Sequence, residues 1–270
     1  MAVSTQRLFV VTGGGSGIGA ETVRALRERG DAVIATGRRE GVLQAIAKDS
    51  GCDYLVSDIT KPADNEALAV KVSETGLQLG GLVHAAGIME SGGVAETTLD
   101  SWHKVLETNL TGPFDLTRHL LPKLRVAGGS IVMVASVAAD RAPAGIAAYA
   151  VSKAGLSALS NLLAVEEGRG ERPVRCNTVN PGWTRSEMAD KELRQAGEFM
   201  GGLSVDEAYA EVTKLVPLGR PARTREVANV IAWLLSPEAS YVNGATVAVD
   251  GGQRWIDAGV LPIENIITPR

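Results

Sequence analysis

Short apolar runs alternate with segments of helical periodicity along almost the whole chain. Several of the runs, such as residues 131–134, are continuously apolar, which is typical of strands covered on both faces. They predict strands at residues 7–12, 32–37, 52–57, 81–84, 130–135, 174–179 and 246–249. The segments between them predict helices at about 17–29, 41–48, 63–74, 99–111 continuing to about 124, 149–168 and 224–236.

This alternation of strand and helix predicts the α/β fold class. We expect a single-domain, Rossmann-like, doubly wound parallel sheet of about seven strands with helices on both faces. No long linker, low-complexity stretch or internal repeat divides residues 1–270, so we expect one domain. Residues 183–216 depart from the rhythm and predict short helices outside the sheet.

The composition fits a protein with a buried core and no strongly charged partner. Of the 270 residues, 45% are hydrophobic and 21% are charged, and the net charge is −4, so no basic field favours nucleic acid or an anionic membrane. Two cysteines make no disulfide framework, and three separate histidines lack metal-ligand spacing. No apolar stretch is long enough to span a bilayer, and the chain starts without a signal-peptide pattern. We therefore expect a cytoplasmic protein without a metal site.

A glycine-rich segment directly follows the first predicted strand. Gly13, Gly17 and Gly19 have the spacing G-x-x-x-G-x-G and lead into the first predicted helix. Glycines at such a turn let the backbone approach a ligand, and the helix N-terminus offers free N–H groups to a pyrophosphate. The segment predicts a nucleotide-binding loop of a dinucleotide-binding protein or of a methyltransferase that uses S-adenosylmethionine.

The end of the second predicted strand separates these alternatives. An Asp or Glu commonly binds the ribose 2′-hydroxyl there, but this chain has Gly37, followed by Arg38 and Arg39. A carboxylate would repel a 2′-phosphate, whereas an arginine can bind it in fork geometry. The pattern favours NADP(H) over NAD(H) and argues against a methyltransferase. In the alternative interpretation, the two arginines only solvate a loop.

Three residues in the second half of the chain predict proton transfer. Tyr149 and Lys153 are one helical turn apart, and Ser136 lies thirteen residues before Tyr149. An unperturbed phenol has a pKa of about 10, and an ammonium on the same helix face would lower that pKa. Ser136 would hold a substrate oxygen in the same pocket. A Tyr four residues before a Lys also occurs by chance in many helices, so the interpretation depends on the other motifs.

Together these motifs resemble those of the short-chain dehydrogenase/reductase family in its single-domain form. The resemblance covers about residues 7–252. Its matching positions are the loop 12–19, Asp58, Ala86-Gly87, Asn109, the set Ser136, Tyr149 and Lys153, Asn180-Pro181-Gly182, and Asp250-Gly251-Gly252. The resemblance implies a dinucleotide-binding and catalytic domain with a nicotinamide cofactor.

The resemblance also implies a role for each catalytic candidate. Tyr149 would donate a proton to a carbonyl oxygen, or remove one from an alcohol, and Ser136 would hydrogen-bond that oxygen. Lys153 would lower the pKa of Tyr149 and hold the ribose hydroxyls of the nicotinamide. Asn109 would anchor a water that continues a proton relay to Lys153. The predicted catalytic residues are Ser136, Tyr149, Lys153 and Asn109.

Further residues are implied in cofactor binding. Asp58 would contact adenine, and Thr184 and Ser186 would hold the carboxamide, with Ser186 standing where the family usually has Thr. The predicted cofactor-binding residues are Gly13, Ser16, Gly17, Ile18, Gly19, Arg38, Asp58, Ile59, Ala86, Gly87, Tyr149, Lys153, Pro181, Gly182, Thr184 and Ser186.

Two positions depart from the family pattern. The Asn-Asn-Ala-Gly run after the fourth strand is His-Ala-Ala-Gly here, beginning at His84, so both amides are lost. We expect His84 to have a structural role and to replace one hydrogen bond that braces the sheet. Ser16 stands where some NADP-dependent members carry a basic residue, so only one of the two common 2′-phosphate anchors is present.

The sequence therefore predicts an NADP-dependent oxidoreductase of the carbonyl reductase or 3-oxoacyl reductase type, acting between a ketone and a secondary alcohol. One alternative is an NAD-dependent secondary-alcohol dehydrogenase. The other is a non-catalytic NADP-binding sensor, which would have no need of Ser136, Tyr149 and Lys153.

Two expectations concern the surroundings of the site. Residues 183–216 are expected to form a mobile substrate lid with Gly197, Gly201 and Gly202 as hinges, or else a static packing element. Its apolar side chains suit a hydrophobic carbonyl or alcohol substrate. The helix at 149–168 is apolar nearly all round, and one sheet covers only one face, so we expect a homo-oligomer. The family resemblance implies a homotetramer.

Overall fold

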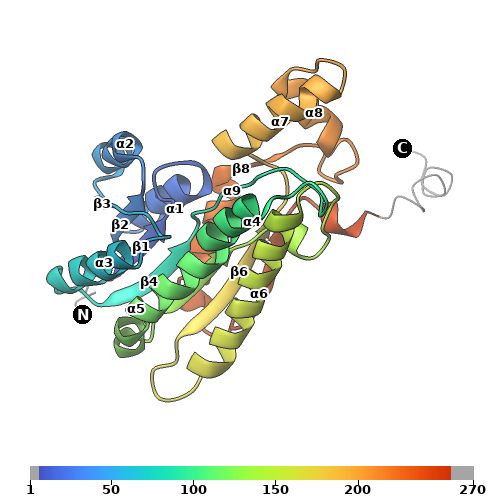
Figure 1. The fold of residues 1–270 in the computed structure, drawn as a ribbon. Helices are drawn as coiled ribbons and strands as arrows, with labels where there is room; N and C mark the ends of the chain where they lie inside the picture. The colour runs from blue at the N-terminus through green and yellow to red at the C-terminus, as the bar shows by residue number, and fades with distance from the viewer. Residues whose placement is uncertain (1–5, 257–270) are drawn as a thin grey trace.

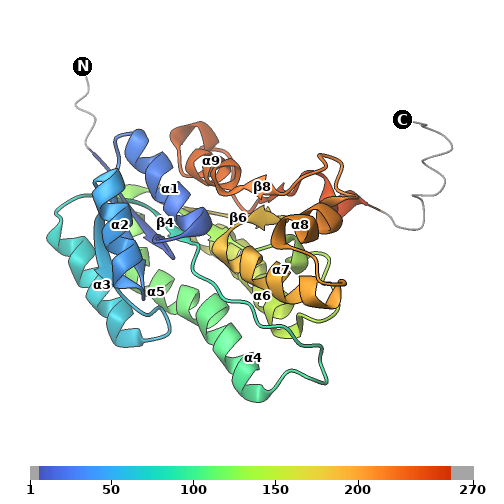
Figure 2. The same cartoon turned by 90° about the horizontal axis from the view of Figure 1, so that it is seen from above.

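Residues 6–256 are described by the computed structural model, and they form a parallel β-sheet with helices on both faces (Figure 1, Figure 2). The sheet has seven strands in the order β3-β2-β1-β4-β5-β6-β9. The strands are β1 (Leu8–Thr12), β2 (Ala32–Gly37), β3 (Asp53–Val56), β4 (Leu79–His84), β5 (Ser130–Val134), β6 (Arg175–Pro181) and β9 (Thr246–Val249). The predicted doubly wound α/β sheet is confirmed.

The strands are apolar because each supplies side chains to two cores. In β1, Leu8 and Val10 pack into the core on one face of the sheet, whereas Phe9 and Val11 pack into the core on the other. Successive side chains of a strand point to opposite faces, so a strand buried on both faces needs an unbroken apolar run.

Each face of the sheet is covered by its own set of helices (Figure 2). One core includes side chains from α3 (Pro62–Glu74), α5 (Gly112–Ala127) and α6 (Ala147–Glu167). The other includes side chains from α1 (Gly17–Glu28), α2 (Glu40–Ser50) and α9 (Thr224–Leu234). The short helix α4 (Leu99–Leu106) continues through a π-helical segment, Glu107–Thr111, directly into α5.

The strand order creates a crevice between β1 and β4. From β1 the chain moves outward to β2 and β3 and then returns to β4 on the other side of β1. Ligands of doubly wound sheets bind at this reversal, beyond the carboxyl ends of the strands. Thr12, the last residue of β1, connects that strand to the end of β4 and the loop after it. Its Oγ1 donates to the Val83 carbonyl at 3.3 Å and accepts from the Ala86 N–H at 3.2 Å.

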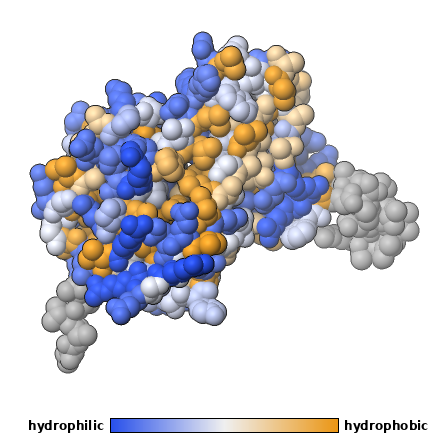
Figure 3. Space-filling view, turned by 60° about the horizontal axis from the view of Figure 1, so that its bottom comes forward, coloured by the Kyte–Doolittle hydropathy of each residue, from blue (hydrophilic) through white to orange (hydrophobic). Residues whose placement is uncertain are grey.

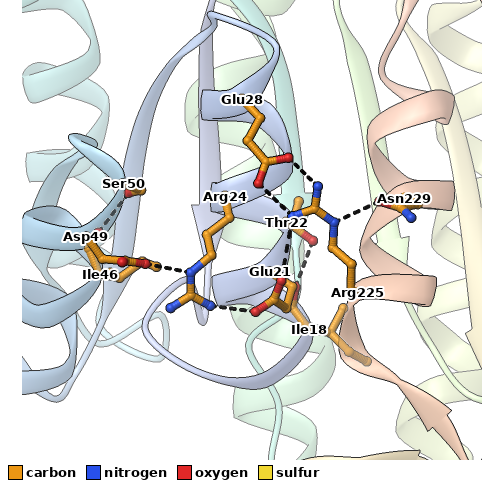
Figure 4. Close-up of polar contacts among 10 residues, drawn as sticks. All are labelled: Ile18, Glu21, Thr22, Arg24, Glu28, Ile46, Asp49, Ser50, Arg225 and Asn229. Carbon is orange, nitrogen blue, oxygen red and sulfur yellow. Dashed lines mark hydrogen bonds and ion pairs between the residues drawn. The ribbon is translucent and has the colours of Figure 1, made fainter.

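Ion pairs tie α1 to its neighbours α2 and α9 (Figure 4). Arg24 contacts Glu21 at 2.5 Å and Asp49 at 2.7 Å, and Arg225 of α9 pairs with Glu28. Pairs of this kind at the surface each contribute little to stability. Their position matters more, because they connect the helix that starts at the glycine-rich loop to both flanking helices.

A helical pair stands apart from the sheet (Figure 1). It consists of α7 (Glu187–Phe199) and α8 (Val205–Thr213), and it has a small core formed by Leu193, Ala208 and Tyr209. The two ends of the segment meet in a short parallel pair of strands, β7 (Thr184–Arg185) and β8 (Ala222–Arg223). This placement agrees with the prediction of short helices outside the sheet.

The glycines expected to act as hinges lie inside this pair rather than at its base. A Cβ on Gly197 would lie 2.4 Å from the Leu203 carbonyl oxygen, so Gly197 allows close packing of α7 against the following turn. Gly201 and Gly202 have φ values of 87° and 84°, which is the left-handed region that glycine favours in turns.

The structure also corrects several predicted boundaries, among them the start of β4. β4 begins at Leu79, two residues before the predicted start, because Gly80 and Gly81 lie within the strand. A Cβ on Gly81 would lie 2.8 Å from Leu235 Cδ2 and 2.9 Å from Phe9 Cδ1, so neighbouring side chains fill the space that a strand residue normally occupies. The predicted continuous helix over 99–124 contains the π-helical segment at 107–111. Among the described residues, no helix is both long and apolar enough to cross a membrane.

Candidate active site

Two cavities lie along the carboxyl ends of the strands and share Gly87 as a lining residue. The first lies against the glycine-rich loop and the end of β2. It is lined by the predicted residues Gly13, Ser16, Arg38, Asp58, Ile59, Ala86 and Gly87. The second has a volume of about 620 Å³ and is lined by the predicted residues Ile18, Gly87, Ser136, Tyr149, Lys153, Pro181, Gly182, Thr184 and Ser186. Of the predicted set, Gly17, Gly19 and Asn109 line neither cavity.

The glycine-rich loop has the geometry of a cradle for a large anion. A Cβ on Gly19 would lie 2.2 Å from the Gly13 carbonyl oxygen, and Gly17 has φ of +54°. Both positions therefore need glycine. Ser16 caps α1 without a side-chain hydrogen bond, which leaves the N–H groups of the first turn available to a ligand. The loop fits the pyrophosphate of a dinucleotide.

The two arginines after β2 differ in their surroundings. Arg38 is exposed and has no hydrogen bond or ion pair with any residue from 6 to 256. Arg39 is engaged: it contacts both carboxylate oxygens of Glu187, at 2.8 and 3.2 Å, and donates to Ser16 Oγ at 2.9 Å. Arg39 therefore joins the glycine-rich loop to the first residue of α7. Local sequence patterns do not reveal this contact, because Arg39 and Glu187 are 148 positions apart.

Asp58 and Ile59 line the first cavity after the end of β3. The Asp58 carboxylate accepts hydrogen bonds from the N–H and the hydroxyl of Thr60, at 3.1 and 2.8 Å, which fixes its orientation. Ile59 is buried, and its carbonyl accepts from Asn65 Nδ2 at 3.0 Å. The cavity thus offers both an apolar side chain and a carboxylate here, a combination that could bind an adenine ring.

Ser136, Tyr149 and Lys153 meet in the second cavity. Burial raises the pKa of Tyr149 to about 12, although a hydrogen bond from Ser136 opposes the shift. Burial also lowers the pKa of Lys153 to about 8. Lys153 Nζ donates to the Val134 carbonyl at 2.8 Å and lies 5.6 Å from the centre of the Tyr149 ring. Among the described neighbours Ser136 lowers the pKa of Tyr149, and the expected effect of Lys153 on that pKa stays a prediction.

Asn109 lies in the π-helical segment between α4 and α5 and is fully buried. Its side chain receives the Ile88 N–H and donates to the Ile88 carbonyl, both at 2.9 Å, and it donates to Ser152 Oγ at 3.0 Å. A Cβ on Gly87 would lie 3.4 Å from both Asn109 Oδ1 and Lys153 Nζ, so the two groups lie close together behind that glycine. Single π-turns of this kind are frequent at functional sites.

His84 is buried in the position predicted for a structural residue. Its Nε2 is 2.8 Å from Thr117 Oγ1 of α5, and its Nδ1 has no partner among the described residues. Burial lowers the pKa of His84 to about 3, so the ring is neutral at physiological pH. The side chain braces β4 against α5.

The loop after β6 supplies the remaining wall of the second cavity. A Cβ on Gly182 would lie 2.7 Å from Gln253 Oε1, so the chain there passes close to the segment that follows β9. Thr184 Oγ1 donates to the Gly182 carbonyl at 3.0 Å. Ser186 caps α7 by accepting from the Ala189 N–H at 3.3 Å. Both hydroxyls are thus positioned at the cavity, although each already has a partner.

The cavity also contains charged residues that the sequence patterns did not assign to the site. They are Glu192 of α7, Arg141 and Arg254. Negative charge on Glu192 raises the pKa of Tyr149, and burial raises the pKa of Glu192 itself. No sequence motif identified Glu192, Arg141 or Arg254 as site residues. Glu192 lies in the segment predicted to be a lid, and that was the only signal for it in the sequence. The described residues contain no group of three or more His, Cys, Asp and Glu side chains that could hold a metal ion.

The fold and the arrangement of the site define a nicotinamide-dependent oxidoreductase of the α/β type. A sequence model for the family described as enoyl-(acyl carrier protein) reductase matches residues 13–254. The chain belongs to the short-chain dehydrogenase/reductase family.

Individual relatives agree with this assignment. The chain is 36% identical to cis-4-hydroxycyclohexanecarboxylate dehydrogenase of Sinomonas cyclohexanicum, over 92% of this chain and 96% of that protein. It is 32% identical to the 3-oxoacyl-(acyl-carrier-protein) reductase FabG of Escherichia coli, over 93% of this chain and 98% of that protein. The crystal structure of a single-residue variant of actinorhodin polyketide ketoreductase with NADPH superimposes with a TM-score of 0.86 at 33% identity, covering 93% of this chain and 98% of that one.

Proposed function

We propose that the protein is an NADP(H)-dependent oxidoreductase that interconverts a ketone and a secondary alcohol. One observation carries the proposal: Ser136, Tyr149 and Lys153 line a single cavity that adjoins the glycine-rich cradle. The relatives named above include a reductase of 3-oxoacyl groups on acyl carrier protein and a dehydrogenase of a cyclic hydroxy acid. Both names describe chemistry at a carbon that bears oxygen.

Tyr149 acts as general acid in the reducing direction. A nicotinamide cofactor, when bound, would supply the hydride for the carbonyl carbon. Ser136 holds the carbonyl oxygen beside the phenol, and the phenol gives its proton to that oxygen as negative charge develops. A buried phenol with a pKa near 12 is protonated at physiological pH, so the acid form is the resting form. Lys153 returns the proton, because burial keeps the pKa of its ammonium near 8.

Asn109 and Ser152 position these groups. Ser152 Oγ donates to the Tyr149 carbonyl at 2.7 Å and receives Asn109 Nδ2 at 3.0 Å. The first turn of α6, which carries the phenol, is thereby fixed to the π-helical segment. Asn109 would also anchor the water that connects Lys153 to solvent.

Arg38 would select NADP(H) over NAD(H). Its guanidinium is exposed, lines the adenosine cavity and lacks a partner among residues 6–256, so a 2′-phosphate could bind without breaking an existing ion pair. Arg39 is already paired with Glu187 and would be a weaker phosphate ligand.

The function is tested with a panel of ketones, 3-oxoacyl thioesters and secondary alcohols, assayed with NADPH and NADH in parallel by absorbance of the reduced cofactor. The variant Tyr149→Phe serves as the control for the mechanism. It should lower turnover by about 10²–10⁴-fold while cofactor binding, measured by fluorescence titration, stays nearly unchanged. A variant that keeps more than about a tenth of wild-type turnover would remove Tyr149 from the mechanism.

We also infer that the protein is a homotetramer. α6 carries exposed apolar side chains at Val151, Leu162 and Val165, and Phe114 of α5 is also exposed. Hydrophobic side chains lie in a band among hydrophilic ones on the face drawn in Figure 3. Light scattering at micromolar protein concentration tests this inference, and a 28.2-kDa monomer would contradict it.

The helical pair α7–α8 would be a substrate lid on a single domain. It has a core of its own, and α7 contributes Met188, Ala189 and Glu192 to the second cavity. Hydrogen exchange of residues 183–216, with and without NADPH plus a reducible ketone, distinguishes a lid from a static element. High protection that ligands do not change would favour the static alternative.

A further inference from the structure

Arg254 places an unpartnered cation at the cavity that contains Tyr149. The residue follows β9, and its side chain lines the same cavity as Ser136 and Tyr149. Its Nε is buried without a hydrogen-bond partner, and the guanidinium makes no ion pair with any residue from 6 to 256. A buried N–H of a charged group without an acceptor is costly, so its presence indicates that a ligand supplies the acceptor.

The backbone of Arg254 is fixed on both sides. Its N–H donates to Asp250 Oδ2 at 2.9 Å, and its carbonyl accepts from Arg141 Nη1 at 2.6 Å. Its guanidinium lies over the Trp255 ring, with Cζ 5.0 Å from the ring centre. Stacking uses the face of a guanidinium and leaves the N–H groups at its edge free to donate. The group is therefore held in place rather than extended into solvent.

The other cations at this cavity are already engaged. Lys153 donates to the Val134 carbonyl, and Arg141 donates to the carbonyls of Arg254 and Ile256. The lining otherwise consists largely of apolar side chains, among them Met89, Val137 and Met188. Among residues 6–256, one cation is thus available for a ligand in mostly apolar surroundings.

Building on the proposed function, we propose that Arg254 binds a carboxylate of the substrate, so that the natural substrate is an oxo acid or hydroxy acid with an apolar body. The carboxylate binds to the guanidinium edge while the reacting oxygen lies at Ser136 and Tyr149. The apolar lining contacts the carbon skeleton between them. Arg254 is then a specificity-determining residue for the reaction.

The charges at the cavity favour a monoanion over a phosphate ester. Among the described residues only one unpartnered guanidinium is available, and Glu192 from α7 faces the same space. A phosphate dianion would find only one free guanidinium for its two charges, and that carboxylate would repel it more strongly than a monoanion. A carboxylate matches the single cation and accepts two parallel hydrogen bonds from it.

Binding of unreactive probes tests this site independently of turnover. Cyclohexanecarboxylate, cyclohexanecarboxamide and cyclohexyl phosphate are titrated into the full-length protein by calorimetry, with and without NADPH. The wild-type protein should bind the carboxylate about ten- to a hundredfold more tightly than the carboxamide, as expected for a charge-assisted hydrogen bond. Arg254→Gln should remove this preference and Arg254→Lys should keep part of it.

The matched control is Arg169→Gln, which removes an exposed arginine that lines neither cavity and should leave the preference unchanged. Circular dichroism checks that each variant is folded. Equal binding of carboxylate and carboxamide by the wild type, or a preference that survives in Arg254→Gln, would overturn the proposal. Tighter binding of the phosphate ester would overturn the choice of a carboxylate.

Turnover separates this proposal from the proposed function. With NADPH, 4-oxocyclohexanecarboxylate should be reduced with a kcat/KM about tenfold or more above that of its methyl ester, and Arg254→Gln should remove the difference mainly through KM. If neither ketone is reduced while the carboxylate preference in binding persists, the ketoreductase function fails and the anion site stands. If both ketones are reduced equally well, the function stands and the role of Arg254 fails.

Discussion

The buried imidazole of His84 should make the folded protein sensitive to mild acid. Burial lowers the pKa of His84 from its ordinary 6.5 to about 3, and the ring is only 1% exposed. The folded state therefore resists protonation over a pH range in which the unfolded chain accepts a proton. Stability from this group is fully present above pH 6.5 and is lost as pH falls toward 3.

The size of the effect follows from these two pKa values. Each unit of pKa difference corresponds to about 1.4 kcal/mol. Between pH 7 and pH 5 the unfolded state takes up most of the proton and the folded state almost none, so the free energy of unfolding should fall by about 2 kcal/mol from His84 alone. The full difference, reached near pH 3, would be about 5 kcal/mol.

The variant His84→Gln isolates this contribution. Glutamine does not titrate and can still hydrogen-bond to Thr117, which contacts His84 Nε2 at 2.8 Å. Urea unfolding at pH 5, 6 and 7, at one protein concentration, gives the free energy of unfolding for the wild type and the variant. Other titrating groups affect both proteins alike, so the fall between pH 7 and 5 should be about 2 kcal/mol smaller in His84→Gln.

The matched control is His103→Gln, because His103 is exposed on α4. The free energy of unfolding of this variant should depend on pH in the same way as that of the wild type. A difference below about 0.5 kcal/mol between wild type and His84→Gln would show that the folded protein accommodates the charged ring, and the reasoning from burial would be refuted.

Three further predictions concern the cofactor and the phenol. The double variant Gly37→Asp/Arg38→Leu should raise the KM for NADPH far more than that for NADH, since the new carboxylate repels a 2′-phosphate; wild-type protein that already prefers NADH would contradict this. Gly19→Ala should weaken binding of both cofactors by about tenfold or more, because its Cβ would lie 2.2 Å from a carbonyl oxygen of the loop; unchanged affinity in a fluorescence titration would argue against a role for this turn. Glu192→Gln should move the rise of alcohol oxidation with pH to lower pH, because the carboxylate raises the pKa of Tyr149; a pH profile identical to that of the wild type would exclude this influence.

Patterns within single elements predicted the fold well. The unbroken apolar runs located the strands because burial on both faces requires them, and all seven predicted strands form the sheet. The π-helical segment at Glu107–Thr111 could not be predicted, because the residues around it keep the apolar spacing of a continuous helix. The segment can be recognised only in the structure, where the Asn109 side chain is hydrogen-bonded to Ile88 and Ser152.

Contacts between distant segments were not predictable in the same way. Local patterns identified Arg38 and Arg39 as neighbours at one loop, yet only Arg39 reaches Glu187. Similarly, the helical spacing of Tyr149 and Lys153 correctly placed both in one cavity, but the hydrogen bond of Lys153 to the Val134 carbonyl depends on how α6 packs against β5. The effect of Lys153 on the pKa of Tyr149 depends on the same packing and stays a prediction.

The arginines along the groove suggest how one site could recognise two anions separately. Arg39 is paired with Glu187, and Arg141 is bound to main-chain carbonyls. Arg38 lines the first cavity and Arg254 the second, and neither has such a partner among residues 6–256. A paired guanidinium must give up its partner before it can bind a ligand, whereas an unpaired one gains a partner. The same criterion that favours Arg38 over Arg39 as the 2′-phosphate ligand therefore favours Arg254 over Arg141 as the ligand of a substrate carboxylate.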